Sequence, residues 1–216
     1  MKWIVPVKRR LGVSRDELFD KWEHLHAPHV RDFAKPEQYR VTFFEAPPAD
    51  SDPPFDGMTE LWFRDWQHWA RTFGDDAPAE RDADGFGQFI APREFQLFTT
   101  EQVIVAGDVS RAHLKQVAFI RRRREVPLQQ LLHAWRETHA PNVAAGIART
   151  PGCLRYAISQ ADRGREGRMD GIAELWWADA DALSAGLQGV EPDGFGDLLL
   201  ADATIRLTGH EFVVVP

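Results

Sequence analysis

Residues 18–30 of this chain read LFDKWEHLHAPHV, and residues 131–143 repeat the pattern as LLHAWRETHAPNV. In both stretches a tryptophan is followed four residues later by a histidine and then by Ala-Pro. The two copies keep a constant register, 113 residues apart. Internal repeats at a fixed spacing determine the architecture of a chain, so this match indicates that the protein consists of two copies of one unit.

The repeated stretch has the periodicity of an amphipathic helix. At about 100° per residue, Phe19, Trp22 and His26 fall within one narrow arc of such a helix. The equivalent residues of the second copy are Leu132, Trp135 and His139. Each half therefore carries an imidazole on an apolar helix face. We expect Pro28 and Pro141 to stop or kink the helix just after the histidine, which leaves it near an irregular helix end.

The composition suits a globular protein and argues against several classes. The 216 residues carry 33 acidic and 26 basic side chains, a formal charge of −7, which argues against a nucleic-acid partner. No run of about 18 apolar residues predicts a membrane span, and the interrupted N-terminal stretch does not predict a signal peptide. Cys153 is the only cysteine, so no internal disulfide can form, and we expect a cytoplasmic protein.

The patterns along each half predict the element order β-α-β-β-α-β. In the first half we expect strands at residues 2–8, 39–45, 58–63 and 95–105, with helices at 14–28 and 64–73. In the second half we expect strands at 114–121, 155–160, 172–177 and 205–215, with helices at 128–141 and 179–186. Loops are expected at 46–56 and 161–169. Two further repeated segments support the duplication. DGMTELWF at 56–63 matches DGIAELWW at 170–177, and DGFG occurs at 84–87 and 193–196.

This order is that of a ferredoxin-like unit, which leaves one face of its sheet uncovered. The first strand is largely apolar on both faces, so it belongs to a sheet that is covered on both sides. We therefore expect an α+β fold in which two ferredoxin-like βαββαβ repeats, residues 1–106 and 114–216 with a linker at 107–113, are fused into one dimeric-type α+β barrel with helices outside. Such a chain would be a monomer or a homodimer of the intramolecular barrel.

The pattern of Phe19, Trp22 and His-Ala-Pro, followed by Tyr39 and ELWF at 60–63, resembles the EthD-like domain of the dimeric α+β-barrel superfamily. Both halves match, so the resemblance covers nearly the whole chain. Members usually form the barrel by dimerising, whereas here one chain would make it. Relatives include aromatic polyketide cyclases and dehydratases of secondary metabolism, muconolactone isomerase, cofactor-free anthrone oxygenases and an accessory protein of ether degradation, and more distant relatives bind haem. The fold alone does not select among these activities.

His26 and His139 are the candidate general bases, because histidine titrates near neutrality and transfers protons without a cofactor. The structural alternative is a buried imidazole that caps the irregular helix end. Tyr39 and Tyr156, the only tyrosines, begin the second strand of each half, and their hydroxyls could polarise a carbonyl or donate a proton. Alternatively they are strand aromatics with the hydroxyl in water.

Glu60 and Glu174 lie in the middle of predicted strands, on the same face as Trp62 and Trp176. A carboxylate there is costly unless it is paired, and burial would raise its pKa. It could orient the histidine or accept a proton itself; alternatively it forms a structural pair with an arginine. The side chains expected to line the substrate sites are Phe19, Trp22, Trp62, Leu132, Trp135 and Trp176. No histidine pair shares a face with an acidic partner, so no metal site is predicted.

These residues predict an enzyme without metal or cofactor that acts on a small hydrophobic, aromatic or polyketide-like substrate. The chemistry would be proton transfer next to a carbonyl, giving dehydration, cyclisation or isomerisation. Two alternatives stay open: a cofactor-free, anthrone-type oxygenase, and a non-catalytic protein that binds haem or another small molecule. Because Trp66 and Trp69 correspond to Ala180 and Leu183, we expect the second half to have the roomier cavity.

Overall fold

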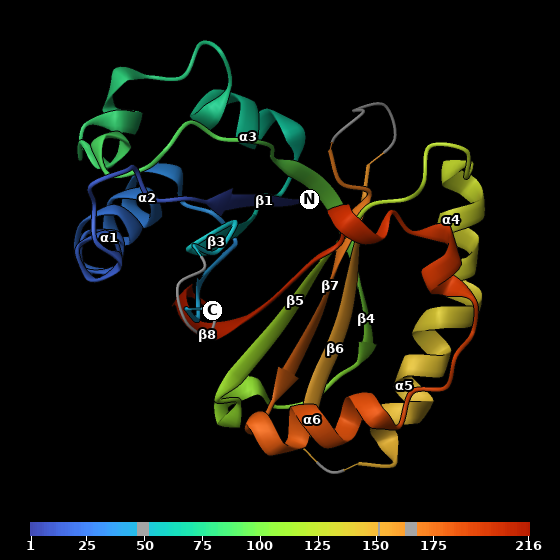
Figure 1. Ribbon diagram of the computed structural model, residues 1–216. Coiled ribbons are helices and arrows are strands. Elements are labelled where there is room, and N and C mark those ends of the chain that lie inside the picture. Colours follow the sequence, from blue (N-terminus) through green and yellow to red (C-terminus); the bar gives the residue numbers. More distant parts are fainter. Residues whose placement is uncertain (47–51, 151, 163–167) are drawn as a thin grey trace. The chain divides into compact units, whose positions relative to one another are not determined.

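The computed structural model describes residues 1–46, 52–150, 152–162 and 168–216 (Figure 1). The first repeat contains β1 (Lys2–Val7), α1 (Arg15–Lys21), η1 (Trp22–His26), α2 (Ala27–Ala34), β2 (Gln38–Phe44), β3 (Gly57–Trp62), α3 (Trp66–Phe73) and β4 (Leu97–Val105). The second repeat contains β5 (Leu114–Ile120), α4 (Leu128–Ala134), η5 (Trp135–His139), α5 (Ala140–Ala148), β6 (Cys153–Ala161), β7 (Gly171–Trp177), α6 (Ala180–Gln188) and β8 (Ile205–Val215). The predicted order is thus confirmed, while the loops expected at 46–56 and 161–169 lie partly outside the described residues.

The strands form a closed barrel in the hydrogen-bonded order β1-β3-β2-β8-β5-β7-β6-β4. The register is the same in both repeats: Lys2 of β1 pairs with Trp62 of β3, and Lys115 of β5 pairs with Trp176 of β7. Every residue of β1 is buried, as its two apolar faces predicted. The protein therefore has the expected α+β fold, with one barrel made by a single chain.

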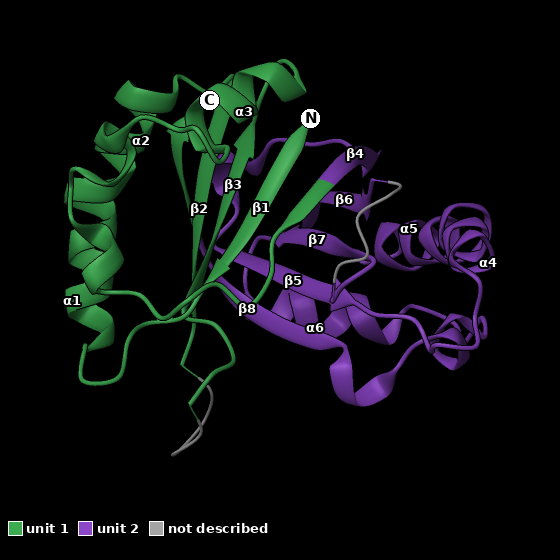
Figure 2. Cartoon of the chain, turned by 90° about the horizontal axis from the view of Figure 1, so that it is seen from above, with its two compact units in different colours: residues 1–98, 211–216 green, residues 99–210 purple. Residues whose placement is uncertain are grey.

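The chain divides into two compact units, residues 1–98 with 211–216 and residues 99–210 (Figure 2). In the first unit, α1 and α2 lie along one face of the sheet of β1, β3 and β2, and Leu18, Trp22 and Val30 pack there with Val5 and Leu61. The second unit has its own core of equivalent elements, in which Trp135 and Val143 belong to the same cluster as Leu175. Each unit thus has its own layer of helices against its own strands.

We expected Pro28 and Pro141 to stop or kink the first helix of each repeat, and the structure contradicts a stop. The helix continues through a π-helical turn, η1 or η5, into α2 or α5, and Pro28 and Pro141 lie in the first turn of those helices. Within η1 the N–H of Ala27 donates to the carbonyl of Trp22, one residue further back than in an α-helix. Proline has no N–H to donate, and a π turn accommodates this without ending the helix. The backbone at the histidines is therefore irregular, as expected, but inside a helix.

Candidate functional site

His26, the last residue of η1, forms a dyad with Asp84. Its Nδ1 lies 2.6 Å from Asp84 Oδ2, and its ring stacks on Phe86 with a centroid distance of 4.0 Å. The other carboxylate oxygen of Asp84 accepts a hydrogen bond from the backbone N–H of Phe86. This tight turn requires a positive φ at Gly85, which glycine adopts without strain. The contact with Asp84 leaves Nε2 as the nitrogen available to a ligand.

His139 is held in the same way in the second repeat. Its Nδ1 lies 2.8 Å from Asp193 Oδ2, and its ring stacks on Phe195 at 4.2 Å. Asp193 also accepts hydrogen bonds from the Phe195 N–H and from the side-chain amide of Asn142. Both histidine side chains keep about a quarter of their surface exposed, 24% for His26 and 26% for His139, so a ligand can reach either ring.

The electrostatics of the two dyads keep the aspartates ionised. Burial by itself would raise the pKa of the Asp84 carboxyl, but the hydrogen bonds from His26 and the Phe86 N–H outweigh it and hold the pKa below its usual value. The pKa of Asp193 is also lowered, since the hydrogen bonds from Asn142, Phe195 and His139 outweigh its burial. An ionised carboxylate on Nδ1 fixes the tautomer of the imidazole and stabilises the imidazolium that forms when Nε2 takes a proton.

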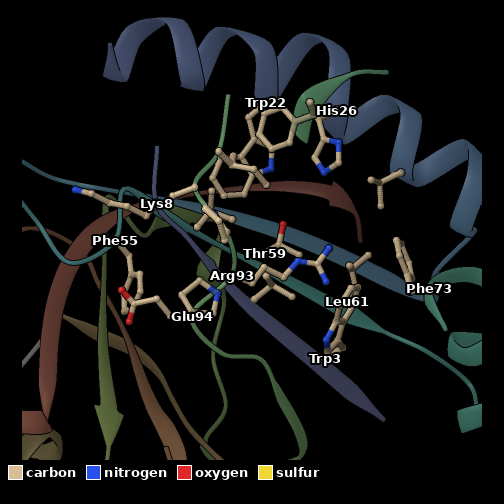
Figure 3. A pocket seen from close by; sticks show the side chains of 18 of the residues that line it. Trp3, Lys8, Trp22, His26, Phe55, Thr59, Leu61, Phe73, Arg93 and Glu94 are labelled. Atoms are coloured by element: carbon tan, nitrogen blue, oxygen red, sulfur yellow. The ribbon is translucent and has the colours of Figure 1, made fainter. Parts of the chain in front are cut away.

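Each histidine lines a cavity within its own unit. The first cavity has a volume of about 70 Å³, and Tyr39 contributes to its wall. Figure 3 shows His26 and Trp22 in the same wall. The second has a volume of about 360 Å³, and His139, Trp135 and Tyr156 occupy the equivalent wall positions. The predicted difference in volume is confirmed, but its cause is not the one expected, because Trp66 and Trp69 are not part of the wall.

The difference in volume comes from other positions of the repeats. Side chains of the first cavity are replaced by smaller or thinner ones in the second, namely Trp3 by Gln116, Val5 by Ala118, Thr59 by Ala173 and Phe73 by Leu187. Trp69 lies behind the wall and packs edge-on against Trp3, with 5.8 Å between the ring centroids. A large aromatic ring on β1 therefore fills the space that remains open in the second unit.

Two donors in each cavity accompany the histidine. The indole N–H of Trp22 and the hydroxyl of Tyr39 are buried and have no hydrogen-bond partner of normal geometry among the described residues. Burial raises the pKa of Tyr39 to about 12, and it raises the pKa of Tyr156 further. Both tyrosines therefore stay protonated at neutral pH. Tyr39 lies within hydrogen-bonding reach of Trp22 and Thr59, and Tyr156 lies within reach of Trp135. Because the Trp22 and Trp135 N–H groups and the Tyr39 hydroxyl have no hydrogen bond of normal geometry among the described residues, an oxygen atom of a ligand would be a better partner for them.

The two glutamates do not orient the histidines. Glu60 forms a fully buried ion pair with Lys2, with 2.7 Å between Nζ and Oε1, and Glu174 pairs with Lys115 at 2.8 Å. Neither belongs to the wall of a cavity, and the partner is lysine rather than the arginine considered from the sequence. Successive strand residues point to opposite faces, so Glu60 faces away from the cavity that Thr59 lines.

The same alternation corrects part of the predicted substrate-binding set. Trp62 and Trp176 accompany the glutamates, and each carries a lysine ammonium over its ring, at 4.7 and 4.5 Å from the centroid. Phe19 stacks on Phe43 at 4.1 Å and does not line the first cavity, and Leu132 does not line the second. Of the expected wall residues, only Trp22 and Trp135 hold that position. The π turn changes the rotation between residues 19 and 26, and a regular helical wheel does not include that change.

Reasoning from the sequence missed Asp84 and Asp193, although it found the repeated DGFG in which they occur. They lie 58 and 54 residues from their histidines, so no local spacing connects the two groups. Within the described ranges, no cluster of three or more His, Cys, Asp or Glu side chains could hold a metal ion. In the same ranges, no helix is both long and apolar enough to cross a membrane.

Comparison with known proteins agrees with the fold. The EthD domain family matches residues 10–93, which include the whole helix of His26 and the turn of Asp84. The first repeat is an EthD domain. The second repeat lies outside the matched residues, but it carries the same π turn, dyad and cavity wall. The family match therefore covers the first repeat, and the second repeat shares its local structure.

Solved structures with the same barrel extend over nearly the whole chain. An anthrone oxidase-like protein has a TM-score of 0.63 at 14% identity, over 100% of this chain and 93% of that one. A chlorite dismutase variant from Candidatus Nitrospira defluvii has a TM-score of 0.60 at 9% identity, over 96% and 90%. A haem-binding protein from Thermus thermophilus has a TM-score of 0.54 at 12% identity, over 98% and 91%. No curated protein matches the sequence. These identities establish a shared fold only.

Proposed function

We propose that this EthD-type protein is a cofactor-independent acid/base enzyme. It removes a proton from a carbon next to the carbonyl group of a small hydrophobic compound, and the second cavity does most of this work. The observation that carries the proposal is the His139–Asp193 dyad in the wall of a largely apolar cavity of about 360 Å³. This volume lies near the lower end of the range for small-molecule sites, about 300–1,000 Å³, and suits a compound of two or three fused rings.

The proton transfer uses groups that are already in place. Nε2 of His139 accepts the proton from carbon, and Asp193 stabilises the resulting imidazolium. The electron pair moves onto the carbonyl oxygen, which becomes an enolate. The hydroxyl of Tyr156 and the indole N–H of Trp135 line the same cavity and would donate to that oxygen. Donors fixed in advance around a developing oxyanion are worth roughly 3–4 kcal/mol each in transition-state stabilisation.

The fate of the enolate decides the reaction class. It can expel a β-hydroxyl as water, attack a second carbonyl or take the proton back at another carbon, giving dehydration, cyclisation or isomerisation. The similarity to an anthrone oxidase-like protein favours a second candidate, an oxygenase. There the carbanion would form a C–O bond with dioxygen, take back the proton as a hydroperoxide, and lose water to leave a new carbonyl.

A haem-binding function is the third candidate, because a solved structure with this fold binds haem. An imidazole that contacts a carboxylate through Nδ1 is typical of histidines that ligate metal ions. The cavity around His139, however, has a volume that favours a two- or three-ring compound over a porphyrin with its side chains. Titration with haemin, followed by absorbance, tests this candidate separately.

The proposal is tested by hydrogen exchange without turnover to product. The protein is incubated under nitrogen in D₂O with 2-tetralone and with anthrone, and deuterium at the acidic carbon is measured by mass spectrometry. We expect exchange above the protein-free rate, and loss of that excess in His139→Ala. Admission of oxygen then separates the candidates, since only an oxygenase consumes it. No catalysed exchange with either ketone would contradict the proposal.

A further inference from the structure

We infer that the first cavity is a binding site for a short-chain carboxylate and thus serves a different ligand from the second. The inference begins with Arg93, which precedes β4 and lines this cavity. Figure 3 shows its guanidinium directed into the cavity from the side opposite His26. The group lies over the ring of Trp3, 5.4 Å from the centroid, and so is held in place by an aromatic face.

The charge of Arg93 is not neutralised by the protein groups that the structure describes. The carboxylate of Asp82 acts on Arg93 through its charge, but Asp82 is already bound by Arg81 at 2.6 Å. The ammonium group of Lys8, which also lines this wall, is bound by Asp52 at 2.6 Å. Partial burial and the neighbouring charge of Arg81 lower the pKa of Arg93 from its usual value, but a guanidinium stays charged at neutral pH. A cationic side chain held against an aromatic ring in a cavity favours the binding of an anionic ligand.

The same wall contains two carboxylates, Asp82, which Arg81 binds, and Glu94, which also has an interaction of its own, together with three groups that can donate hydrogen bonds. Trp22 Nε1 and Tyr39 Oη are buried without a hydrogen-bond partner of normal geometry among the described residues, and the Thr59 hydroxyl lines the cavity as well. Tyr39 stays a donor because burial raises its pKa to about 12. A carboxylate has two oxygens that accept several hydrogen bonds and can take a bidentate guanidinium. The wall therefore offers the groups that a carboxylate needs, together with apolar surface for a short tail.

Comparison with the second repeat shows that Arg93 and Thr59 have no equivalents in the second cavity, whose own guanidinium, that of Arg206, comes from a different position. Backbone pairing equates Ile90 with Leu199, since each forms the isolated bridge of its repeat. By this register, Arg93 corresponds to Asp202; both residues are exposed, but Asp202 does not line the second cavity. Thr59 corresponds to Ala173, so this hydroxyl is also missing there. The first repeat thus combines two added polar groups with a cavity of only about 70 Å³.

The volume limits the length of the acid. One water molecule requires about 10–15 Å³ of cavity volume, so a cavity of 70 Å³ admits only a few non-hydrogen atoms. Two- to four-carbon carboxylates satisfy this limit, whereas a fused-ring compound does not. We therefore assign the first cavity to acids such as acetate and propionate, which carry one charge and a small apolar tail.

The test is calorimetric titration of the full-length protein with propionate, with propionamide as an uncharged ligand of the same shape. We expect saturable binding of propionate and affinity at least about tenfold lower for propionamide, since a charge-assisted contact contributes about 1.5–3 kcal/mol. Arg93→Gln should lower the affinity for propionate by at least the same factor, whereas Arg93→Lys should keep part of that affinity. Thr59→Ala, which introduces the residue of the second repeat, should weaken it by a smaller factor.

Arg206→Gln is the matched control, because Arg206 lines the second cavity but not the first. It should leave the propionate affinity unchanged. Circular dichroism of each variant verifies that the fold is retained, which we expect because Arg93 and Arg206 both keep part of their surface in solvent. Equal affinities for propionate and propionamide, equal losses in Arg93→Gln and Arg206→Gln, or the absence of saturable binding would each overturn the inference.

Discussion

The two cavities of this protein share their reactive groups and differ in the surfaces around them. Both have a histidine at the end of a π turn, an aspartate on its Nδ1, and a tryptophan and a tyrosine in the wall. The first is narrowed by aromatic rings and is lined by Arg93 and Thr59, whereas the second is roomier and has neither of these two groups at the equivalent positions. The difference indicates that a fused pair of repeats can keep one set of catalytic groups while each half adapts to a different ligand.

The largest expected effect comes from removing the base of the open cavity. His139→Ala should reduce the exchange rate of 2-tetralone by at least about 10²-fold, the usual contribution of a general base. His26→Ala should cause a loss at least about tenfold smaller, because the first cavity cannot hold a fused-ring ketone. Parallel exchange measurements on the two variants check this. Equal losses of about half would show two equivalent sites and remove the asymmetry.

A smaller but clear effect should follow from the aspartate of the same dyad. Asp193→Asn keeps the shape of the side chain but removes the charge that stabilises the imidazolium, so kcat should fall by about 10–100-fold. KM should change little, since Asp193 contacts the imidazole on the side away from the ligand. Asn142→Ala removes one of the hydrogen bonds to Asp193, together with one to the carbonyl of Glu191, but keeps the charge of Asp193; it is the control and should have a weaker effect. A change in KM alone would assign Asp193 to binding.

The volume difference can be tested by exchanging wall residues between the repeats. Gln116→Trp with Leu187→Phe introduces the rings of the first cavity into the second. We expect KM for 2-tetralone to rise about tenfold, since overfilling a packed site costs typically 1–3 kcal/mol. The thermal midpoint of the variant should be compared with that of the native chain, to separate lost binding from lost folding. An unchanged KM would show that the ketone binds elsewhere.

The smallest expected effect concerns stability at acid pH. The folded pKa of Asp84 and of Asp193 is depressed, so their dyads contribute stability that is complete above the unfolded value, about pH 4, and is lost as the pH falls through the folded value. The double variant Asp84→Asn and Asp193→Asn should therefore lose less stability on acidification than the native chain. Thermal midpoints between about pH 2 and 6 measure this. If the thermal midpoints of the double variant and of the native chain fall equally with pH, the lowered pKa values of Asp84 and Asp193 are contradicted.

The repeat made most of the fold predictable from the sequence. Twin copies of the helix, the ELW strand and the DGFG turn predicted the element order, and the doubly apolar β1 predicted a sheet covered on both faces. Strand alternation also placed Glu60 and Trp62 on one face. It could not tell which face the helices cover, and this determines whether Glu60 or Thr59 meets the ligand. The answer depends on packing between residues far apart in the chain.

The candidate site was predictable only in part, for a physical reason of a different kind. His26, Trp22 and Tyr39, with their equivalents, were found because each carries chemistry that is visible in one residue. The aspartate of the dyad is defined by a tertiary contact, and the π turn replaces the regular rotation that an amphipathic pattern assumes. Arg93 was not singled out, because its cavity is created by Trp3 and by the segment before β4 together.

The central claim is that the open cavity of the second repeat binds the fused-ring substrate beside His139. A crystal structure of the protein with 2-naphthol, which mimics the enol of 2-tetralone and does not react, tests it most directly. We predict one naphthol in the second cavity, with its hydroxyl within hydrogen-bond distance of Tyr156 Oη or Trp135 Nε1 and its ring edge facing His139 Nε2, and no naphthol in the first cavity. Naphthol bound beside His26, or bound in neither cavity, would contradict the account.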